Sequence, residues 1–287
     1  MTRPTSSLFA AALLATLASC ARDVAIGHED ALAAAGEPGS GGSDPLGAGA
    51  MNGEPAGGVM NGGGFGGADA LAGGPTGALL WSADHETASL DQWLGDGDGI
   101  QFLQRSGQLE LTTERAHSGT HALSATITTD DGELHQAVMG RNLRLREGRY
   151  GAWYLLPESP RADYWVILKL SNGPQLDRFD LDIEAHEGAA AHLRLFEHPN
   201  TWISEPASIA FPIGRWVHVE VLYRSSPDVD GRLIVLQDDQ LVLDSGARVT
   251  ANDDQVTFYC GSISRSVTPS PFTLFIDDAS IHADSLP

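Results

Sequence analysis

Three acidic residues at alternating positions, Asp180, Asp182 and Glu184, are the side chains of this chain best suited to chemistry. Because residues i, i+2 and i+4 of a strand share one face, the spacing predicts three carboxylates on one face, with His186 just beyond them. The positions between them are apolar and are expected to face the core: Phe179, Leu181 and Ile183. Paired carboxylates cleave glycosidic bonds in glycosidases, and carboxylate oxygens also bind cations. The pattern leaves three interpretations open: a hydrolase site, a ligand or cation site, and a solvated polar face.

The segments around this strand also alternate between apolar and polar residues, which is typical of β-structure. Turn-forming residues such as Asp230-Gly231 separate the segments, and no amphipathic helix longer than about three turns is expected. Many short strands in roughly 200 residues predict an all-β, two-sheet antiparallel sandwich or jelly roll spanning 79–287. The predicted strands are 108–112, 122–128, 164–168, 179–184, 192–196, 216–221 and 272–276.

Six fragments spread over this predicted domain match a known type of protein domain. They are 81–87 with Trp93, 116–123, 148–157, 211–219, a hairpin near 231–235, and 275–281. Together they resemble the concanavalin A-like lectin/glucanase superfamily, which includes heparin-lyase-like and laminin-G-like members. The resemblance covers nearly all of 79–287 and implies a jelly-roll sandwich whose commonest role is carbohydrate recognition. Because one fold hosts many activities, it indicates the fold more firmly than the function.

The strand 179–184 resembles the Glu-x-Asp-x-Glu strand of the laminarinase and lichenase family. That resemblance implies Asp180 as nucleophile, Asp182 as assisting residue and Glu184 as general acid/base. The chain departs from the family pattern because Asp180 replaces a glutamate, which shortens the side chain by one methylene. Cα atoms four residues apart on a strand are about 13 Å apart, whereas retaining hydrolases need carboxyl groups about 5–5.5 Å apart. The shorter side chain therefore works against hydrolysis.

A second set of residues could cleave a uronate polysaccharide by β-elimination. This reaction needs a tyrosine or histidine that abstracts a proton, and a side chain such as arginine that neutralises the uronate carboxylate. Neighbouring predicted strands offer Tyr164, His192, Arg194 and His198. The Arg-x-Glu-x-Arg and Gln-x-His strands typical of jelly-roll alginate lyases are absent, and Leu168-Lys169-Leu170 stands where the latter would fall. The acidic composition also suits polyanionic uronates poorly.

Aromatic side chains favour glycan binding, because exposed tryptophan and tyrosine rings stack on the apolar faces of sugars. In alternating strands one residue of each adjacent pair must face outward, and core packing is the alternative for any single ring. The aromatic candidates are Trp153, Tyr154, Tyr164, Trp165 and Trp202. The full predicted ligand-binding set is Trp153, Tyr164, Lys169, His186, His192 and Arg194.

Acidic residues at the two ends of the predicted domain suggest a cation site. Asp277-Asp278 beside the last predicted strand, with Glu86 near the first, resemble the structural calcium corner of many carbohydrate-binding sandwiches. Carboxylate oxygens are the ligands that Ca²⁺ prefers. The resemblance implies Ca²⁺ as a cofactor, and solvated turn carboxylates are the alternative. The sequence carries no Ser-His-Asp signature, phosphate-cradling loop or Cys/His metal spacing.

The first twenty residues predict export. A short stretch with Arg3, an apolar run from Leu8 to Leu17 and small residues before a cysteine are typical of a secretory signal, whereas a transmembrane span needs about 20 apolar residues. Leu17-Ala18-Ser19-Cys20 resembles the bacterial lipobox, which implies cleavage before Cys20 and lipidation of its thiol. Because Ala21 stands where an aspartate would hint at inner-membrane retention, the resemblance implies a surface-exposed outer-membrane lipoprotein of the bacterial cell envelope. An ordinary signal peptide is the alternative.

The composition limits the partners of the protein. The chain has 38 Asp and Glu against 17 Lys and Arg, a formal net charge of -21, and no basic cluster, so nucleic acid is excluded and membrane contact is expected only through the lipid anchor. Residues 20–78 are rich in Gly, Ala, Pro and Ser and predict a disordered tether after the signal peptide 1–19. Lipidation of Cys20 would leave Cys260 as an unpaired, buried and inert thiol.

These features favour a monomeric, surface-anchored lipoprotein that presents a carbohydrate-recognising sandwich to a polysaccharide or other glycan. Two alternatives stay open. One is a polysaccharide-cleaving enzyme, either a hydrolase that uses Asp180, Asp182 and Glu184 or a lyase. The other is a purely structural surface protein.

Overall fold

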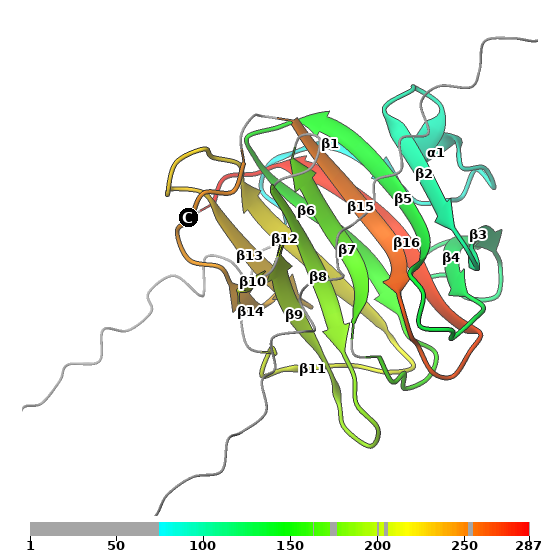
Figure 1. Cartoon of the computed structure of the whole chain (residues 1–287). Coiled ribbons are helices and arrows are strands. Elements are labelled where there is room, and N and C mark those ends of the chain that lie inside the picture. The colour runs from blue at the N-terminus through cyan, green and yellow to red at the C-terminus, as the bar shows by residue number, and fades with distance from the viewer. Residues whose placement is uncertain are drawn as a thin grey trace, which may run out of the picture. The chain divides into compact units, whose positions relative to one another are not determined.

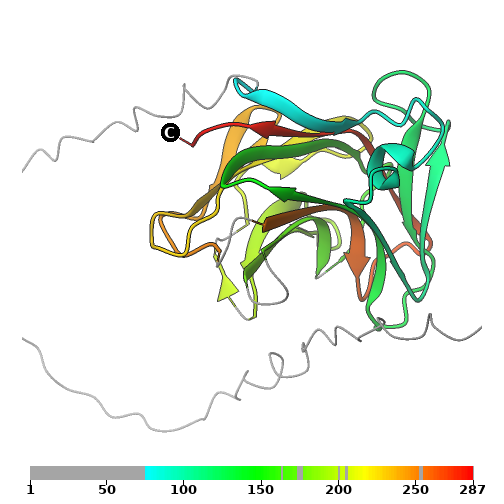
Figure 2. The ribbon, with the colours of Figure 1, turned by 90° about the horizontal axis from the view of Figure 1, so that it is seen from above.

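The computed structural model describes residues 75–162, 164–172, 177–199, 201–203, 206–251 and 255–286. These residues form two antiparallel sheets of eight strands each, which lie face to face as two layers (Figures 1 and 2). The one helix in these segments is α1 (Asp91–Leu94). Sheet A contains, in spatial order, β14 (Gln240–Asp244), β13 (Arg232–Gln237), β12 (Trp216–Arg224), β6 (Glu147–Leu155), β16 (Phe272–Ala283), β4 (Ala122–Ile127) and β3 (Gly107–Thr112), with β1 (Ala78–Ala83) paired to β16. Sheet B contains β10 (Thr201–Trp202), β9 (Ala191–Glu197), β8 (Asp177–Glu184), β7 (Trp165–Asn172), β15 (Gln255–Ser264), β5 (His135–Arg144) and β2 (Gly99–Gln104), with β11 (Ala210–Phe211) paired to β9.

The predicted all-β, two-sheet antiparallel sandwich is confirmed. Each of the seven segments predicted from alternation either lies inside an observed strand or extends beyond one by a single residue. Strand β5 escapes the alternation pattern because residues 135–141 are buried without interruption. A strand that is covered on both faces has no polar side to alternate with its apolar side.

Strands that are far apart in the sequence lie side by side. β15 lies between β5 and β7 in sheet B, and β16 lies between β6 and β4 in sheet A (Figure 1). Two runs of consecutive hairpins complete the arrangement: β7, β8 and β9 in sheet B, and β12, β13 and β14 in sheet A. Each run presents the outward side chains of three neighbouring strands as one continuous surface. These two surfaces face away from each other on opposite sides of the sandwich.

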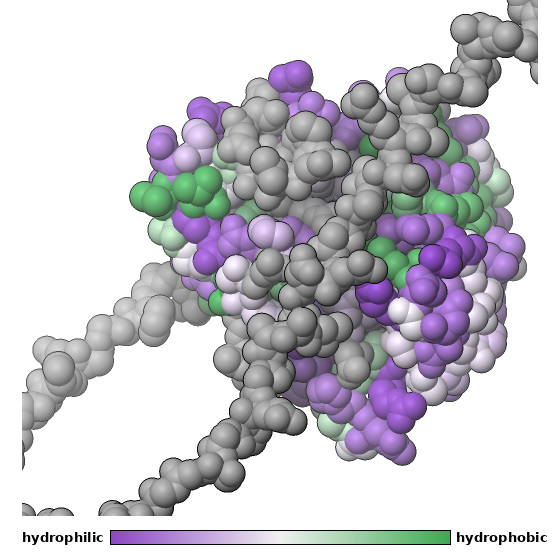
Figure 3. All heavy atoms as spheres, in the orientation of Figure 1, coloured by the Kyte–Doolittle hydropathy of each residue, from purple (hydrophilic) through white to green (hydrophobic). Residues whose placement is uncertain are grey.

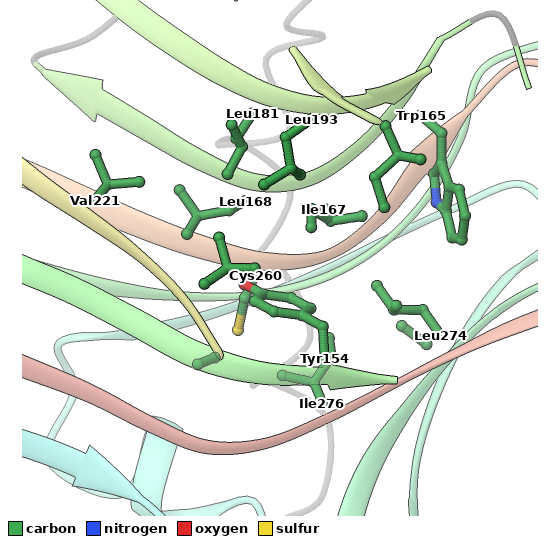
Figure 4. Packing of buried hydrophobic residues seen from close by; sticks show 14 of the residues in the cluster. Tyr154, Trp165, Ile167, Leu168, Leu181, Leu193, Val221, Cys260, Leu274 and Ile276 are labelled. Carbon is green, nitrogen blue, oxygen red and sulfur yellow. The ribbon is translucent and has the colours of Figure 1, made fainter. Parts of the chain in front are cut away.

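One large cluster of buried apolar residues fills the space between the sheets. Figure 4 shows Tyr154, Leu274 and Ile276 of sheet A meeting Trp165 and Cys260 of sheet B in this cluster. Cys260 is fully buried and unpaired, and burial raises the pKa of its thiol, in agreement with the predicted inert thiol. Truncating a residue of such a core costs about 2–5 kcal/mol, so this cluster is the main source of stability.

On the face that Figure 3 shows, the described surface is mostly hydrophilic, with small hydrophobic groups between polar ones. No helix in the described segments is long and apolar enough to cross a membrane. Cys20, the signal peptide 1–19 and most of the tether 20–78 lie outside the described residues, so lipidation, the tether and the domain boundaries stay predictions.

Candidate functional site

Strand β8 presents its carboxylates on the outer face of sheet B, as the alternation predicts. The intervening residues Phe179, Leu181 and Ile183 all belong to the buried core. The three carboxylates form a row, here named the carboxylate row, between β7 on one side and β9 on the other. Asp180 and Asp182 are only 2% and 0% exposed, and Glu184 is the more accessible member. The interpretation of this row as a solvated polar face is therefore wrong for its first two members.

Arg194 of β9 lies directly opposite Asp182 and pairs with two members of the row. Its Nη2 atom is 2.6 Å from Asp182 Oδ2, and its Nη1 atom is 2.9 Å from Glu184 Oε1. Asp182 Oδ1 also accepts the backbone N–H of Trp165. Burial raises the pKa of Asp182 to about 6, although the Arg194 guanidinium opposes the shift. Because Asp182 is enclosed, it can hold Arg194 in position but cannot touch a substrate.

Arg194 is also fixed by an aromatic ring. Its guanidinium carbon lies 3.5 Å from the centroid of the Trp202 ring, at which distance cation–π attraction is strong. Trp202 itself is 43% exposed and contacts Phe196 edge to face. This end of the outer face therefore offers a large aromatic surface with a rigidly held cation beneath it.

Asp180 joins two further polar side chains from different segments. Tyr164 Oη donates a hydrogen bond to Asp180 Oδ2 at 2.9 Å, and His198 Nε2 lies 2.5 Å from the same oxygen. Asp180 and His198 are buried, whereas Tyr164 is half-buried. We name these residues the Tyr164–Asp180–His198 group. Its phenol has solvent-accessible surface, and a carboxylate and an imidazole stand behind it.

Apolar side chains continue the outer face of sheet B beyond Tyr164. Three buried residues form a small cluster, with three larger side chains packed against it: Val138, Val166 and Ile263, then Leu134, Tyr164 and Tyr259. The Tyr259 ring lies over Gly140, where an added Cβ would be 2.7 Å from two ring carbons. The outer face thus combines a polar half on β8 and β9 with an apolar half on β5, β7 and β15. This combination suits sugars, which present both hydroxyl groups and apolar ring faces.

Two more predicted ligand-binding residues, Lys169 and His192, share this outer face with Tyr164 and Arg194. Lys169 of β7 lies opposite Asp180 of β8, and its Nζ atom is 5.5 Å from the centroid of the Tyr259 ring. His192 lies opposite Glu184 on β9, and its Nδ1 atom is 2.6 Å from the carbonyl oxygen of Ala207.

His186 is the exposed member of the predicted ligand-binding set. It follows β8, and its Nε2 atom lies 3.4 Å from Glu184 Oε1. It therefore lies at the rim of the carboxylate row rather than inside it.

Trp153 is separated from the other predicted ligand-binding residues. It lies on β6 in sheet A, and the imidazoles of His117 and His218 stack on its ring at centroid distances of 3.7 and 4.9 Å. These imidazoles cover ring surface that a sugar would need. The alternation argument located Trp153 correctly in a strand but could not assign the strand to a sheet.

Tyr259 is the residue of this face that the sequence analysis missed. It stands in the run 256–260, which reads as a buried strand because its neighbours are apolar. Its position beside Lys169 follows from the pairing of β15 with β7, and these two strands are about 90 residues apart in the chain. No local pattern predicts a pairing over such a separation.

The carboxylates of the predicted calcium corner have hydrogen-bond donors as partners. Glu86 accepts two backbone N–H groups from 120–121, and Asp277 accepts two from 117–118. Asp278 contacts the side chains of the same two residues, 117–118, at 2.7 and 2.9 Å. In the described segments, the only group of three or more acidic, His or Cys ligands within 4.8 Å of one another lies elsewhere. The donors, rather than converging ligand oxygens, tie this loop to β16, so Ca²⁺ binding here stays a prediction.

The carboxylate row does not present two facing carboxylates of the kind that glycosidases use. Asp180 is engaged at one end of the row by Tyr164 and His198, and Glu184 at the other end by Arg194. The enclosed Asp182 lies between them. The hydrolase roles implied for these residues stay a prediction, which this geometry does not favour.

Solved structures share the fold of this chain. An endo-β-1,4-glucuronan lyase from the fungus Trichoderma reesei is 14% identical, with 71% of this chain and 95% of that chain covered and a TM-score of 0.53. The cellulose induced protein Cip1 is 13% identical, with 71% and 98% covered and a TM-score of 0.54. No protein-family model and no curated protein matches the chain. At these identities the likeness shows the fold alone.

Proposed function

We propose that the outer face of sheet B binds a polysaccharide and that the Tyr164–Asp180–His198 group cleaves it by β-elimination. The observation that carries this proposal is the shared oxygen: Tyr164 Oη and His198 Nε2 both contact Asp180 Oδ2. A phenol becomes a base only when it loses its proton, and this carboxylate oxygen lies within proton-transfer distance of the hydroxyl. The likeness of the fold to a glucuronan lyase supports the reaction class.

The residues of this group account for every proton that moves in the proposed reaction. Tyr164, after passing its proton toward Asp180 and His198, removes the proton at C5 of a uronate ring. The electron pair forms a C4–C5 double bond, and the C4–O glycosidic bond breaks. The leaving oxygen then takes the proton from Tyr164. The products are an unsaturated uronate end and a new reducing end.

Lys169 is the cation that we assign to the uronate carboxylate. It lies opposite Asp180 on the same face and is half-buried. A positive group beside the carboxylate stabilises the negative charge that develops when the C5 proton leaves. The net charge of -21 repels an anionic chain only weakly at this site, because charges more than about 8 Å from the chain are screened at physiological salt.

The test is the release of unsaturated products from uronate polysaccharides. We expect the full chain to raise the ultraviolet absorbance of glucuronan, alginate or polygalacturonate, and Tyr164→Phe to lower that rate by about 10²–10⁴-fold, the usual contribution of a general acid–base group. Tyr154→Phe is the matched control, because its hydroxyl is buried in the core without a hydrogen-bond partner. Equal rates for wild type and Tyr164→Phe would contradict the assignment.

A second candidate function is glycan recognition without cleavage. The observation that favours it is the burial of Asp180, Asp182 and His198, because buried and mutually paired groups make a rigid platform. This function predicts glycan binding with no increase in unsaturated or reducing ends, and binding that is weakened when Trp202 is replaced by leucine. Release of saturated oligosaccharides from laminarin or lichenan that is lost in Glu184→Gln would instead establish a hydrolase.

We also propose that the protein is anchored to the bacterial outer membrane through Cys20. The support is the sequence alone: an apolar run that ends in Leu17-Ala18-Ser19-Cys20. Labelled palmitate should enter the wild type and not Cys20→Ser in cells of the source bacterium or a suitable bacterial host. Equal labelling of both forms would contradict the anchor.

A further inference from the structure

We propose that His218, Glu220 and Asp239 bind a divalent transition-metal ion, Zn²⁺ in the first place, on the outer face of sheet A. One ligand atom from each residue lies within 4.8 Å of the other two, and no other group of this kind exists in the described segments. The site lies on the sheet opposite the Tyr164–Asp180–His198 group. It is therefore independent of the proposed polysaccharide chemistry.

The backbone positions all three side chains on one side of β12. His218 and Glu220 are two residues apart on this strand and so share a face. Asp239 lies in the turn between β13 and β14, where Asp238 and Asp239 have φ values of 49° and 63°, the left-handed pair of a tight two-residue hairpin. Asp238 exchanges two hydrogen bonds with the backbone of His218, at 2.8 and 2.9 Å. The turn is thus pinned beside His218, and Asp239 with it.

Two of the three ligand groups make no hydrogen bond to the described part of the protein. In the described part of the chain, neither the His218 ring nor the Asp239 carboxylate makes a hydrogen bond; the Nδ1 atom of His218 is 3.8 Å from Glu220 Oε2, beyond hydrogen-bond length. The Trp153 ring stacks on this imidazole and fixes its plane. These groups are available to a metal, in contrast to the carboxylates around Asp277.

Glu220 supplies a buried and oriented carboxylate. It is 3% exposed, and Arg149 donates to its Oε2 atom at 3.2 Å. Asp284 pairs with Arg149 at 3.1 Å and offsets its positive charge. An outer-shell donor that holds a ligating carboxylate is a regular part of metal sites.

The charge around the site matches a divalent cation. The carboxylates of Glu220, Asp238, Asp239 and Asp284 face two guanidinium groups, those of Arg149 and Arg215. With His218 neutral, the assembly has an excess of two negative charges. A bound M²⁺ ion would neutralise this excess.

Gly151 lies close to two of the ligand residues. This glycine of β6 lies opposite Glu220, and a Cβ added to it would be 2.9 Å from Glu220 Cγ and 3.4 Å from His218 Nε2. The φ angle of Gly151 is not in the left-handed region, so its backbone does not require glycine. Glycine at this position instead allows the Glu220 and His218 side chains to lie close to β6.

The ligand types select the metal. One imidazole nitrogen with two carboxylate oxygens suits Zn²⁺, whereas Ca²⁺ binds through oxygen atoms alone. Zinc bonds of about 2.0–2.2 Å in a tetrahedron place ligand atoms about 3.3–3.6 Å apart. His218 Nδ1 and Glu220 Oε2 are 3.8 Å apart, so the ligand side chains would have to move slightly toward one another. Three protein ligands leave a fourth position for water.

The test measures Zn²⁺ binding by the full chain without a histidine tag. After removal of metals with EDTA, Zn²⁺ is titrated in competition with a chromogenic chelator, and Co²⁺ is used as a spectroscopic probe. We expect one tight site, about 100-fold weaker in His218→Gln and about 10-fold weaker in Asp239→Asn, with the visible bands of bound Co²⁺ lost in the first variant. Asp228→Asn is the matched control, at an exposed position away from the site.

Three outcomes would overturn the proposal. They are a wild type that binds no Zn²⁺ at micromolar concentration, equal affinities for the wild type and both site variants, and equal losses in the site and control variants. Circular dichroism without metal checks that each variant is folded. If His218→Gln does not fold, Asp239→Asn still decides the question, because Asp239 is exposed in a turn and its replacement removes no packing.

Discussion

The outer faces of the two sheets carry similar alternating polar residues, but these residues differ in their partners. On sheet B the polar side chains pair with one another, whereas on sheet A some make no hydrogen bond within the described residues. On β8 of sheet B, the residues at i and i+2 are Asp180 and Asp182, and on β12 of sheet A they are His218 and Glu220. The difference comes from the neighbouring strands. Arg194 lies opposite Asp182 and pairs with both Asp182 and Glu184, whereas Gly151 lies opposite Glu220, and Arg149 donates to Glu220 alone of the three proposed metal ligands. The chemistry of a polar strand face is therefore decided across the sheet rather than along the strand.

The largest expected effect on stability is that of removing Arg194, which pairs with Asp182 and Glu184 on sheet B. Arg194→Met leaves Asp182 buried without its guanidinium partner, which should lower the free energy of unfolding by about 3–5 kcal/mol. The control is Arg232→Met, because Arg232 and Asp244 form a pair that is about one third exposed and should contribute less than about 1 kcal/mol. Urea unfolding of both variants measures the difference. Equal losses would show that burial does not distinguish the two pairs.

The second prediction concerns pH. The pKa of Asp182 is raised from 3.8 to about 6 by burial, so the folded state binds a proton more tightly than the unfolded state. The stabilisation from this proton is present below pH 4 and is lost as the pH rises through 6, a change of about 3 kcal/mol by linkage. Between these values, unfolding free energies of wild type should fall relative to those of Asp182→Asn. A difference between the two proteins that does not vary with pH would show that Arg194 fully offsets the burial of Asp182.

The third prediction tests whether His218, Glu220 and Asp239 on sheet A bind Zn²⁺. At a Zn²⁺ concentration 100-fold above its dissociation constant, the wild type should gain about 2.7 kcal/mol, because the ion binds only the folded state. For a domain of this size the melting temperature should rise by roughly 5–10 °C. His218→Gln should show no such rise, whereas Tyr164→Phe on the other sheet should behave as the wild type. A shift of equal size in His218→Gln would place the zinc elsewhere.

The same contrast explains which features can be predicted from the sequence. The alternation of 179–184 predicts the inward and outward faces of β8 correctly, because that periodicity is a property of one strand. The partners are non-local: Tyr164 and Asp180 are 16 residues apart, and Arg194 and Asp182 are 12 apart. These contacts depend on hairpin register, which shifts by bulges such as the one between Val166 and Leu168.

The position of a strand within the sandwich is equally hidden from local patterns. Trp153 and Tyr164 look alike as outward aromatic candidates, yet Trp153 lies on β6 in sheet A, and Tyr164 directly precedes β7 of sheet B. The metal ligands that we propose were also out of reach. His218 and Glu220 read as ordinary alternation on a strand, and Asp239 reads as a turn residue. Only the hairpin between β13 and β14 brings them together.

The smallest expected effects on stability come from replacing two glycines, one on each sheet, which test the two outer faces separately. Gly151→Ala in sheet A places a Cβ 2.9 Å from Glu220 Cγ, and Gly140→Ala in sheet B places one 2.7 Å from the Tyr259 ring. Because a side chain can shift in each case, each variant should lose only about 1 kcal/mol of stability.

The two variants should nevertheless differ in function. Gly151→Ala should weaken Zn²⁺ binding through the displaced Glu220 carboxylate and leave polysaccharide cleavage unchanged. Gly140→Ala should weaken polysaccharide binding through the displaced Tyr259 ring and leave Zn²⁺ affinity unchanged. Zinc titration and product release measured on both proteins decide the matter. If each variant changed both readouts, the faces would be coupled through the core, and the independence of the two sites would be wrong.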